Sequence, residues 1–327
     1  MPCYNVAPYV GRCIESIEAQ DISREEYEVI CVDDCSKDNT VEVIKEYQKQ
    51  YANICLVQHE VNQTAGGARN TGIREAEGEY LWFVDPDDAI LPNVLKTISN
   101  KIAKSKVEIL FFNYQMQKES GEVVESRYTL FEGELSGQEY VTNYLGGRLS
   151  TYCNIYSCVF KREFIQENGI EYPKLRAGQD VLFIWKSILS CQRCAIIEEV
   201  CYNYIRRSDS ITGSKGKFTA RAIMSQSLLS AYEFNNLLKQ FPDINPAIKR
   251  NITNAIHCAL NDESRKIMYA DHTNRKGFYT MFAELKDKID AMQTHMDRKT
   301  KNIFRYGMPY VLWRLMILGY SIVGNKK

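Results

Sequence analysis

Long apolar runs are absent from this chain of 327 residues, and so is an excess of charge of either sign. No uninterrupted apolar stretch reaches the roughly 20 residues of a transmembrane helix, so we expect none. Lysine plus arginine and aspartate plus glutamate both number 41, and this balance argues against a protein that binds nucleic acid through its overall charge. The four histidines form no motif. The length suffices for one large domain and a smaller one.

We expect no secretory signal sequence, and the cysteines do not form a paired set. Its 11 cysteines are odd in number and scattered along the sequence. These features predict reduced thiols in a cytoplasmic protein. Cys191 and Cys194 form the close pair, but neither a second pair nor a group of histidines lies nearby to complete a zinc site. Core or surface thiols are therefore favoured over metal ligands.

The most apolar segment lies near the end of the sequence. Residues 306–324 contain Arg314 as their single charge, and four basic residues lie between positions 298 and 305. This pattern is typical of a helix that lies in a membrane surface, and a terminal helix docked on the protein core fits it equally well. Both interpretations stay open for residues 298–324. The first predicts peripheral contact with the inner face of the cell membrane.

Strand and helix patterns alternate in the first part of the chain. Short apolar, β-branched runs predict strands at 28–33, 54–58, 80–84 and 107–114. Helical spacing of apolar residues predicts helices at 41–51, 66–76, 93–104 and 180–190. Such alternation with short connections predicts an α/β fold, with a mostly parallel sheet and helices on both of its faces. After residue 215 the pattern is mainly helical, so we divide the chain into domains 1–215 and 216–327.

Carboxylates follow two of the predicted strands. Asp33 and Asp34 end one strand, and Asp85, Asp87 and Asp88 follow another. Ligands of open α/β sheets bind beyond the carboxyl ends of the strands. Clustered carboxylates need a compensating cation or donor, and Mg²⁺ and Mn²⁺ are commonly shared between carboxylates and substrate phosphates. An acidic turn is the alternative, because Asp-Pro sequences favour turns. Two acidic pairs at successive strand ends favour the metal–diphosphate site.

A segment rich in small residues lies between the two acidic sites. It runs from Asn62 to Gly72 and places Gly66 at the start of a predicted helix. Free N–H groups at such a start can bind an anion, and Arg69 can contact a phosphate or a base edge. No Gly-Lys-Ser/Thr follows, so the segment is not a P-loop. A tight helix start alone explains the small residues equally well.

Further charged candidates lie downstream. Asp180 stands at the predicted start of the helix over 180–190, where the helix dipole favours an acid whether or not it is also a base. Arg206 and Arg207 follow a short strand-like run and either face an anionic group or belong to a solvated loop. The sequence leaves both alternatives open.

The order of these motifs resembles that of the family 2 inverting glycosyltransferases, of the kind that build bacterial cell-surface polysaccharides. The resemblance covers roughly residues 1–215 and has several ordered motifs at family-like spacing. These motifs are Pro2-Cys-Tyr4-Asn5, Val32-Asp33-Asp34 with Ser36 and Asp38, Asn62 with Ala68-Arg69-Asn70, Gly78-Glu79-Tyr80, Asp85-Pro86-Asp87-Asp88 and Gly178-Gln179-Asp180.

The resemblance implies a GT-A fold, in which a nucleotide-binding α/β sheet is merged with an acceptor-binding half. It also implies a role for each matching position. Pro2, Tyr4 and Asn5 are expected to line the nucleotide pocket, with Asp33 among the nucleotide-binding residues. Asp34 is expected to accept a hydrogen bond from the base, usually uracil, and Arg69 to lie by the nucleotide. Asp85 is expected to face the ribose and the metal, Asp87 to ligate Mn²⁺ or Mg²⁺, and Asp180 to be the general base.

The implied reaction transfers a sugar from a nucleotide-diphosphate donor, commonly a UDP-sugar, to a hydroxyl of a glycan or lipid-linked acceptor. A metal on the diphosphate neutralises the leaving group, and a carboxylate removes the proton of the attacking hydroxyl. Two alternatives remain. One is a catalytically inactive paralogue that binds sugar nucleotides, and the other is a nucleotidyltransferase, which usually shows a Gly-rich segment and a lysine near the first strand.

Two departures from the family pattern stand out. Gln179 occupies the position before the expected base, where the family usually has glutamate. The family also begins with an apolar strand ahead of the Pro-x-Tyr-Asn segment, whereas that segment begins here at Pro2. We expect the missing first strand to leave unpaired strand edges and a gap in the core, and we expect residues upstream of Met1 to complete the sheet.

Overall fold

The computed structural model describes residues 1–127, 133–145, 154–175, 178–207, 220–269, 284–297 and 300–301. The chain forms two compact units. The first comprises Met1–Lys217 with Asp243–Ile248, and the second comprises Phe218–Pro242 with Lys249–Lys327. The functional division that we predict at residue 215 stays a prediction.

The first sheet of unit 1 is parallel, as predicted. Its strands are β1 (Pro2–Cys3), β2 (Val29–Asp33) and β3 (Ile54–Gln58), in that order. Asp33 pairs with Gln58, so the residues that follow both strands emerge at the same edge. The central strand β2 is largely buried, whereas β3 lies at the sheet edge and buries only Ile54 fully. The connecting helices are α1 (Ala7–Glu18), α2 (Thr40–Gln50) and α3 (Thr64–Glu75).

The second sheet is mixed, and the predicted parallel order does not extend to it. Its order is β4-β8-β6-β9-β5, with β7 paired to β6, and only β6 and β9 are parallel neighbours. Strand β7 runs back along β6 after a short connection, which antiparallel pairing permits, whereas β8 returns to β6 only after β7 and α5. The strands are β4 (Tyr80–Trp82), β5 (Ala89–Ile90), β6 (Ile109–Lys118), β7 (Val123–Arg127), β8 (Cys158–Lys161) and β9 (Cys194–Arg206).

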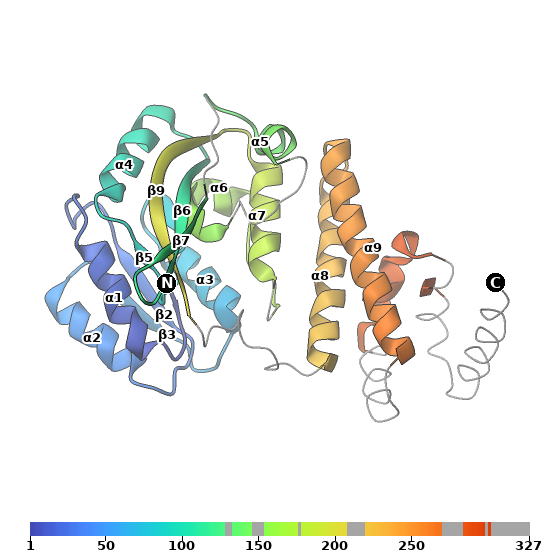
Figure 1. The fold of residues 1–327 in the computed structure, drawn as a ribbon, viewed down its shortest axis with the longest axis horizontal. Coiled ribbons are helices and arrows are strands. Elements are labelled where there is room, and N and C mark those ends of the chain that lie inside the picture. Colours follow the sequence, from blue (N-terminus) through green and yellow to red (C-terminus); the bar gives the residue numbers. More distant parts are fainter. Residues whose placement is uncertain are drawn as a thin grey trace. The chain divides into compact units, whose positions relative to one another are not determined.

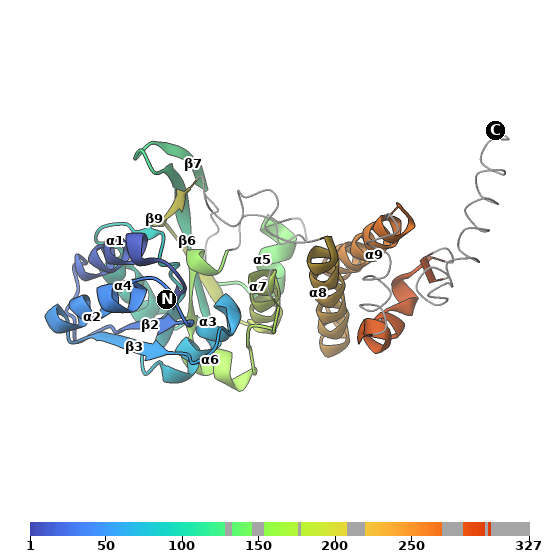
Figure 2. The same ribbon diagram turned by 90° about the horizontal axis from the view of Figure 1, so that it is seen from below.

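Helices cover both faces of the sheets of unit 1, as predicted. Helices α1, α2 and α4 lie on one side, and α3, α6 and α7 lie on the other (Figures 1 and 2). The remaining helices of this unit are α4 (Val94–Ser105), α5 (Gly137–Tyr144), the 3₁₀ turn η1 (Ile155–Ser157), α6 (Arg162–Glu167) and α7 (Gln179–Ser190). The later chain is helical, as expected, with α8 (Ala220–Gln240), α9 (Pro246–Tyr269) and the 3₁₀ turn η2 (Gln293–His295).

An aromatic cluster fixes the start of α7 against the end of β4. The ring of Phe83 meets Phe183 edge-on at 5.3 Å between centroids. Phe183 in turn stacks on Tyr172 at 4.1 Å, and all three side chains are buried. Aromatic contacts of this kind contribute beyond simple apolar burial. The cluster therefore holds the first turn of α7 beside the residues that follow β4, which is where the acidic motifs meet.

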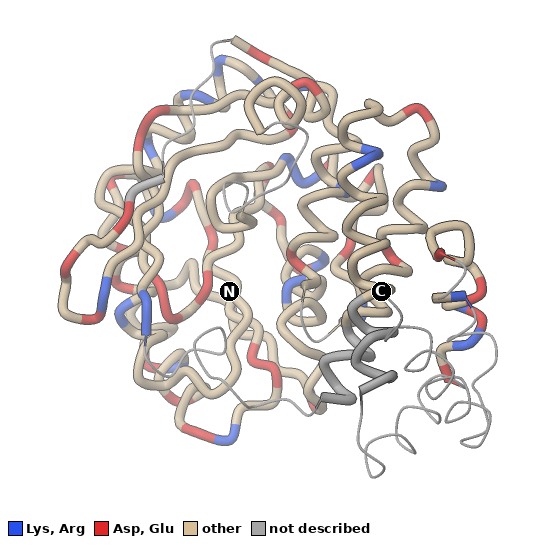
Figure 3. Tube along the Cα trace, turned by 45° about the vertical axis from the view of Figure 1, so that its right-hand side comes forward, with Lys and Arg blue, Asp and Glu red and all other residues tan. Residues whose placement is uncertain are grey.

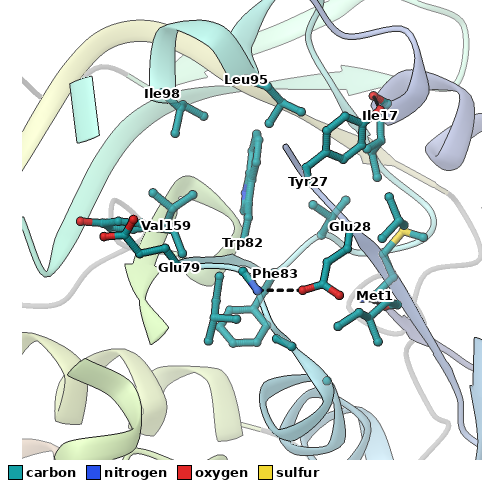
Figure 4. A pocket seen from close by; sticks show the side chains of 18 of the residues that line it. Met1, Ile17, Tyr27, Glu28, Glu79, Trp82, Phe83, Leu95, Ile98 and Val159 are labelled. Atoms are coloured by element: carbon teal, nitrogen blue, oxygen red, sulfur yellow. Dashed lines mark hydrogen bonds between the residues drawn. The ribbon is translucent and has the colours of Figure 1, made fainter. Parts of the chain in front are cut away.

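A cavity of about 360 Å³ separates the two sheets. Strands β1 and β4 are the edge strands of their sheets, and the cavity lies between residues of β2 and β4. Its walls are mainly apolar, with Trp82, Leu95 and Ile98 directed into it and Glu28 at its rim (Figure 4). The strand expected ahead of Pro2 stays a prediction. None of the predicted metal carboxylates lines the cavity.

Acidic and basic residues are interspersed along the described chain, in keeping with its zero net charge (Figure 3). None of the described helices is both long enough and apolar enough to cross a membrane. The segment for which we predict membrane contact, 298–324, lies outside the described residues apart from Thr300 and Lys301.

Two glycines of α3 give a matched test of the packing. A methyl group at Gly72 would meet only Val32, at 3.9 Å, whereas one at Gly66 would overlap Gln179 and press on Tyr172 at 3.0 Å. We expect Gly72→Ala to raise the free energy of unfolding by about 0.5–1 kcal/mol through helix propensity. Gly66→Ala should lower it instead. Urea denaturation measures both, and equal effects of the two substitutions would contradict this packing of α3.

Candidate functional site

The acidic motif forms a tight turn after β4. The N–H of Asp88 donates to the backbone oxygen of Asp85 at 3.1 Å, which closes the turn around Pro86. Arg12 donates to the backbone oxygen of Asp87 at 2.8 Å and ties the turn to α1. The side chains of Asp85 and Asp87 are both 27% exposed. The turn thus presents two partly accessible carboxylates on a fixed backbone.

Arg69 on α3 joins two carboxylates that lie far apart in the sequence. Its Nη2 atom lies 2.6 Å from Oδ1 of Asp85, and its Nη1 atom lies 2.9 Å from Oδ1 of Asp180. The guanidinium is buried, 5.4 Å from the ring centre of Tyr172. Burial alone would lower the pKa of Arg69, but the charges of Asp85 and Asp180 outweigh burial and raise it. Arg69 is therefore a fixed positive charge between both acids.

Asp180 occupies the first turn of α7, two residues after Gly178. Gly178 has a φ of +73°, a conformation that glycine adopts without strain. The Asp180 side chain is 48% exposed. Burial raises the pKa of Asp180, the charge of Asp85 adds to the rise, and Arg69 opposes it. The neighbouring Gln179 is buried, and a neutral amide there avoids a further buried carboxylate beside Asp180.

Asp87 has a separate cationic partner. Nη2 of Arg207 lies 2.7 Å from Oδ2 of Asp87, and the guanidinium lies 4.1 Å from the ring centre of Tyr9. Burial is the main cause that raises the pKa of Asp87, Asp85 adds to the rise, and Arg207 opposes it. Arg206 is exposed at the end of β9 and contacts none of the described site carboxylates. Of the two predicted arginines, the structure brings Arg207 to the acidic turn.

Asp88 lies inside the protein rather than in the site. Its carboxylate accepts hydrogen bonds from Tyr202 Oη and from the N–H of Ile205, each at 2.7 Å. Tyr202 Oη also accepts from the N–H of Asp85 at 3.1 Å. Asp88 is 1% exposed, and burial is the main cause that raises its pKa well above its ordinary value. The geometry gives Asp88 the role of joining the acidic turn to β9.

The residues predicted to line a nucleotide pocket lie at the end of the first sheet. Pro2 belongs to β1, Tyr4 is 48% exposed, and Asn5 has a φ of +53°. The backbone of Asn5 donates to Ser36 Oγ at 3.0 Å, and its side-chain oxygen accepts from the N–H of Lys37 at 2.7 Å. These bonds fasten the segment after β1 to the loop after β2, so that Tyr4 faces outward beside it.

Asp34 is enclosed by donors. Its Oδ1 atom lies 2.8 Å from Nδ1 of His59 and accepts from the N–H of Gln63 at 2.7 Å. Asn62 donates to the backbone oxygen of Asp34 at 3.0 Å. Asp34 and Asp33 are each 2% exposed, and each retains one carboxylate oxygen without a described hydrogen-bond partner. Hydrogen-bond donors therefore surround one oxygen of the Asp34 carboxylate.

The acidic turn fits a divalent cation whose remaining coordination positions are filled by the substrate. Among the described residues, no group of three or more His, Cys, Asp or Glu side chains could hold a metal by itself. Mg²⁺ and Mn²⁺ in phosphate sites commonly take only one or two carboxylates and leave the other positions to phosphates and water. Asp85 and Asp87 lie close enough for one charge to raise the pKa of the other. This pair meets that requirement.

The sequence motifs identify the acids of the site but miss two residues that hold them. His59 gave no motif, although it directly follows β3, next to the pair Asp33–Gln58 in the register of the first sheet. Tyr202 lies in the middle of β9 and reaches the acidic turn from 117 positions away. A residue that acts on another side chain across a long separation leaves no local pattern.

Tyr202→Phe tests the connection between the acidic turn and β9. Removing the hydroxyl leaves a buried oxygen of Asp88 and the N–H of Asp85 without this partner. We expect the free energy of unfolding to fall by about 1–3 kcal/mol, measured by urea denaturation. The control is Tyr47→Phe, because the Tyr47 hydroxyl donates to Glu15 at an exposed site. Equal losses in both variants would contradict the proposed connection.

Comparison with known proteins gives one family. The sequence profile described as Glycosyl transferase family 2 matches residues 1–169. The poly(ribitol-phosphate) beta-glucosyltransferase of Bacillus spizizenii is 28% identical over 211 residues, 64% of this chain and 32% of that protein. The poly(ribitol-phosphate) beta-N-acetylglucosaminyltransferase TarS of Staphylococcus aureus is also 28% identical over 211 residues, 64% of this chain and 35% of TarS. The chain spans about a third of the length of these relatives.

Solved structures confirm the predicted GT-A fold. A fragment of S. aureus TarS in complex with UDP-GlcNAc superposes with a TM-score of 0.60 at 22% identity, covering 94% of this chain and 91% of that one. The mannosyltransferase PcManGT from Pyrobaculum calidifontis, in complex with GDP-Man and Mn²⁺, gives a TM-score of 0.50 at 16% identity. The superposition covers 94% of this chain and 85% of that chain. With a family profile that spans more than half of its length, the chain belongs to glycosyl transferase family 2.

Proposed function

We propose that the chain transfers a sugar from a UDP-sugar to a hydroxyl of a glycan or lipid-linked acceptor, with inversion at the anomeric carbon. The observation that carries this proposal is the bridge from Arg69 to both Asp85 and Asp180. It places the expected base beside the acidic turn, although the two motifs are far apart in the sequence. A UDP-sugar bound between the acidic turn and Asp180 would have a cation site on one side and a proton acceptor on the other.

Family membership and the similar proteins support the donor assignment. The two relatives are named as a glucosyl- and an N-acetylglucosaminyltransferase, and the TarS fragment that shares this fold was solved with UDP-GlcNAc. Both act on poly(ribitol-phosphate) by name, which makes a surface polymer the acceptor class that we propose here. The reaction would take place on the cytoplasmic side, where nucleotide sugars are the donors.

The residues of the site suit a direct displacement. Asp87 and Asp85 would hold Mn²⁺ or Mg²⁺, which when bound neutralises the charge of the departing diphosphate. Asp180 would take the proton of the attacking hydroxyl, and its half-exposed side chain leaves room for that hydroxyl. Its raised pKa makes the carboxylate a stronger base than an ordinary aspartate. Arg69 would keep both acids oriented while the charges shift.

Two substitutions separate the proposed roles. Asp180→Asn should lower kcat for release of UDP from a UDP-sugar by about 10²–10⁴-fold, because the amide cannot accept the proton. Asp87→Ala should instead weaken activation by Mn²⁺, because the ion loses a carboxylate. The measurement is Mn²⁺-dependent UDP release from a panel of UDP-sugars. Asp290→Asn, at a partly exposed position in unit 2, is the control and should leave the rate unchanged.

Other outcomes of that assay identify the rival functions. UDP binding without turnover of any donor would indicate an inactive paralogue that binds sugar nucleotides. Release of pyrophosphate from UTP and a sugar phosphate would indicate a nucleotidyltransferase. Full activity of Asp180→Asn would contradict the role of Asp180 as the base.

The pH profile tests the coupling of Arg69 to Asp180. Only ionised Asp180 accepts a proton, so the rate should rise with pH through the raised pKa of this group. Arg69 opposes that rise, and its removal in Arg69→Gln should raise the pKa further. We therefore expect the acid limb of kcat for UDP-sugar hydrolysis to move to higher pH. Lys186→Gln, on the same helix, is the control, and an acid limb that moves to lower pH would contradict the coupling.

A further inference from the structure

Asp34 is held so that one carboxylate oxygen stays available. The N–H of Asp34 donates to the backbone oxygen of Cys3 at 2.7 Å, and Asn62 donates to the backbone oxygen of Asp34 at 3.0 Å. Its Oδ1 atom accepts from Gln63 and from His59. Its Oδ2 atom is buried and has no described partner. A buried acceptor without a partner is costly, which makes Oδ2 ready to accept from a ligand.

A series of hydrogen-bonded polar side chains leads from the protein surface to Asp34. Nη2 of Arg74 donates to Thr71 Oγ1 at 2.8 Å. Thr71 Oγ1 lies 2.9 Å from Nε2 of His59, and Nδ1 of His59 lies 2.8 Å from Oδ1 of Asp34. Arg74 is exposed, whereas the other three side chains are buried. This series thus has a guanidinium at its outer end and a carboxylate at its inner end.

The hydrogen bonds of this series all donate in one direction, from Arg74 toward Asp34. An arginine only donates, so Thr71 Oγ1 accepts from Arg74 and its hydroxyl hydrogen is available for Nε2 of His59. With its ring neutral, His59 donates from Nδ1 to Asp34 and accepts at Nε2, which satisfies both ring nitrogens. Hydrogen bonds in such a series strengthen one another. The series fixes the rotation of the Asp34 carboxylate and therefore the direction of Oδ2.

We propose that His59, Thr71 and Arg74 are positioning residues that set the nucleobase selectivity of the site by orienting Asp34 toward an N–H donor of the base. This inference rests on the proposed function, because it takes Asp34 to be the acceptor that faces the base. Uracil carries a hydrogen on N3 and donates to a carboxylate. Cytosine carries a lone pair on N3 and repels it. A carboxylate held in one orientation discriminates between them, whereas a carboxylate free to rotate does so less.

The test compares the affinities of UDP and CDP in the presence of Mn²⁺, measured by isothermal titration calorimetry. Thr71→Val preserves the shape of the side chain and removes the hydroxyl between Arg74 and His59. We expect its affinity for UDP to fall by about 3–10-fold, the effect of one neutral hydrogen bond, while its affinity for CDP stays nearly constant. His59→Gln keeps a donor for Asp34 and should lose less selectivity than His59→Leu. Ile73→Val, in the same helix, is the matched control.

The outcomes separate this inference from the function on which it rests. A wild-type protein that binds neither UDP nor CDP contradicts the proposed function and overturns the inference with it. A wild-type protein that prefers UDP, with the same ratio of affinities in Thr71→Val, overturns the inference alone. Equal losses for both nucleotides show a purely structural role and also overturn it. If His59→Leu does not fold, Thr71→Val and Arg74→Met give the answer on their own.

Discussion

The ion pairs of Arg69 are the constraint on which the site depends. A buried guanidinium needs partners, because the cost of removing it from water exceeds what packing returns. Asp85 and Asp180 supply those partners at 2.6 and 2.9 Å, from the turn after β4 and from the start of α7. Loss of either acid would leave a buried charge partly uncompensated. Both acids therefore stabilise the buried guanidinium, and the proposed reaction uses both for its chemistry.

The same site contains a second cation that a metal would have to replace. Arg207 pairs with Asp87 at 2.7 Å and stacks over Tyr9. Arg69 lies on α3 between Asp85 and Asp180, whereas Arg207 directly follows β9 and pairs with Asp87. A divalent ion attracts Asp87 more strongly than a single guanidinium does. We therefore regard Arg69 as the permanent counter-ion of the site and Arg207 as the exchangeable one.

Local patterns predicted the first half of the fold well. Strand β3 and helix α2 lie within one residue of the expected ranges, because apolar spacing and short connections determine them. The mixed second sheet was not predicted, because β8 pairs with both β4 and β6 across long separations. The site likewise combines residues that local motifs predict with contacts between distant parts of the sequence. Asp85, Asp87 and Asp180 came from motifs, while the contact of Arg69 with Asp180 spans 111 positions and has no local signal.

The most direct test of this account is an anomalous-scattering map from crystals grown with UDP and Mn²⁺. The account predicts a manganese peak against Asp87 and Asp85, with Arg207 displaced from Asp87 and Arg69 still bridging Asp85 and Asp180. A manganese peak elsewhere, or UDP bound with Arg207 still paired to Asp87, would contradict it.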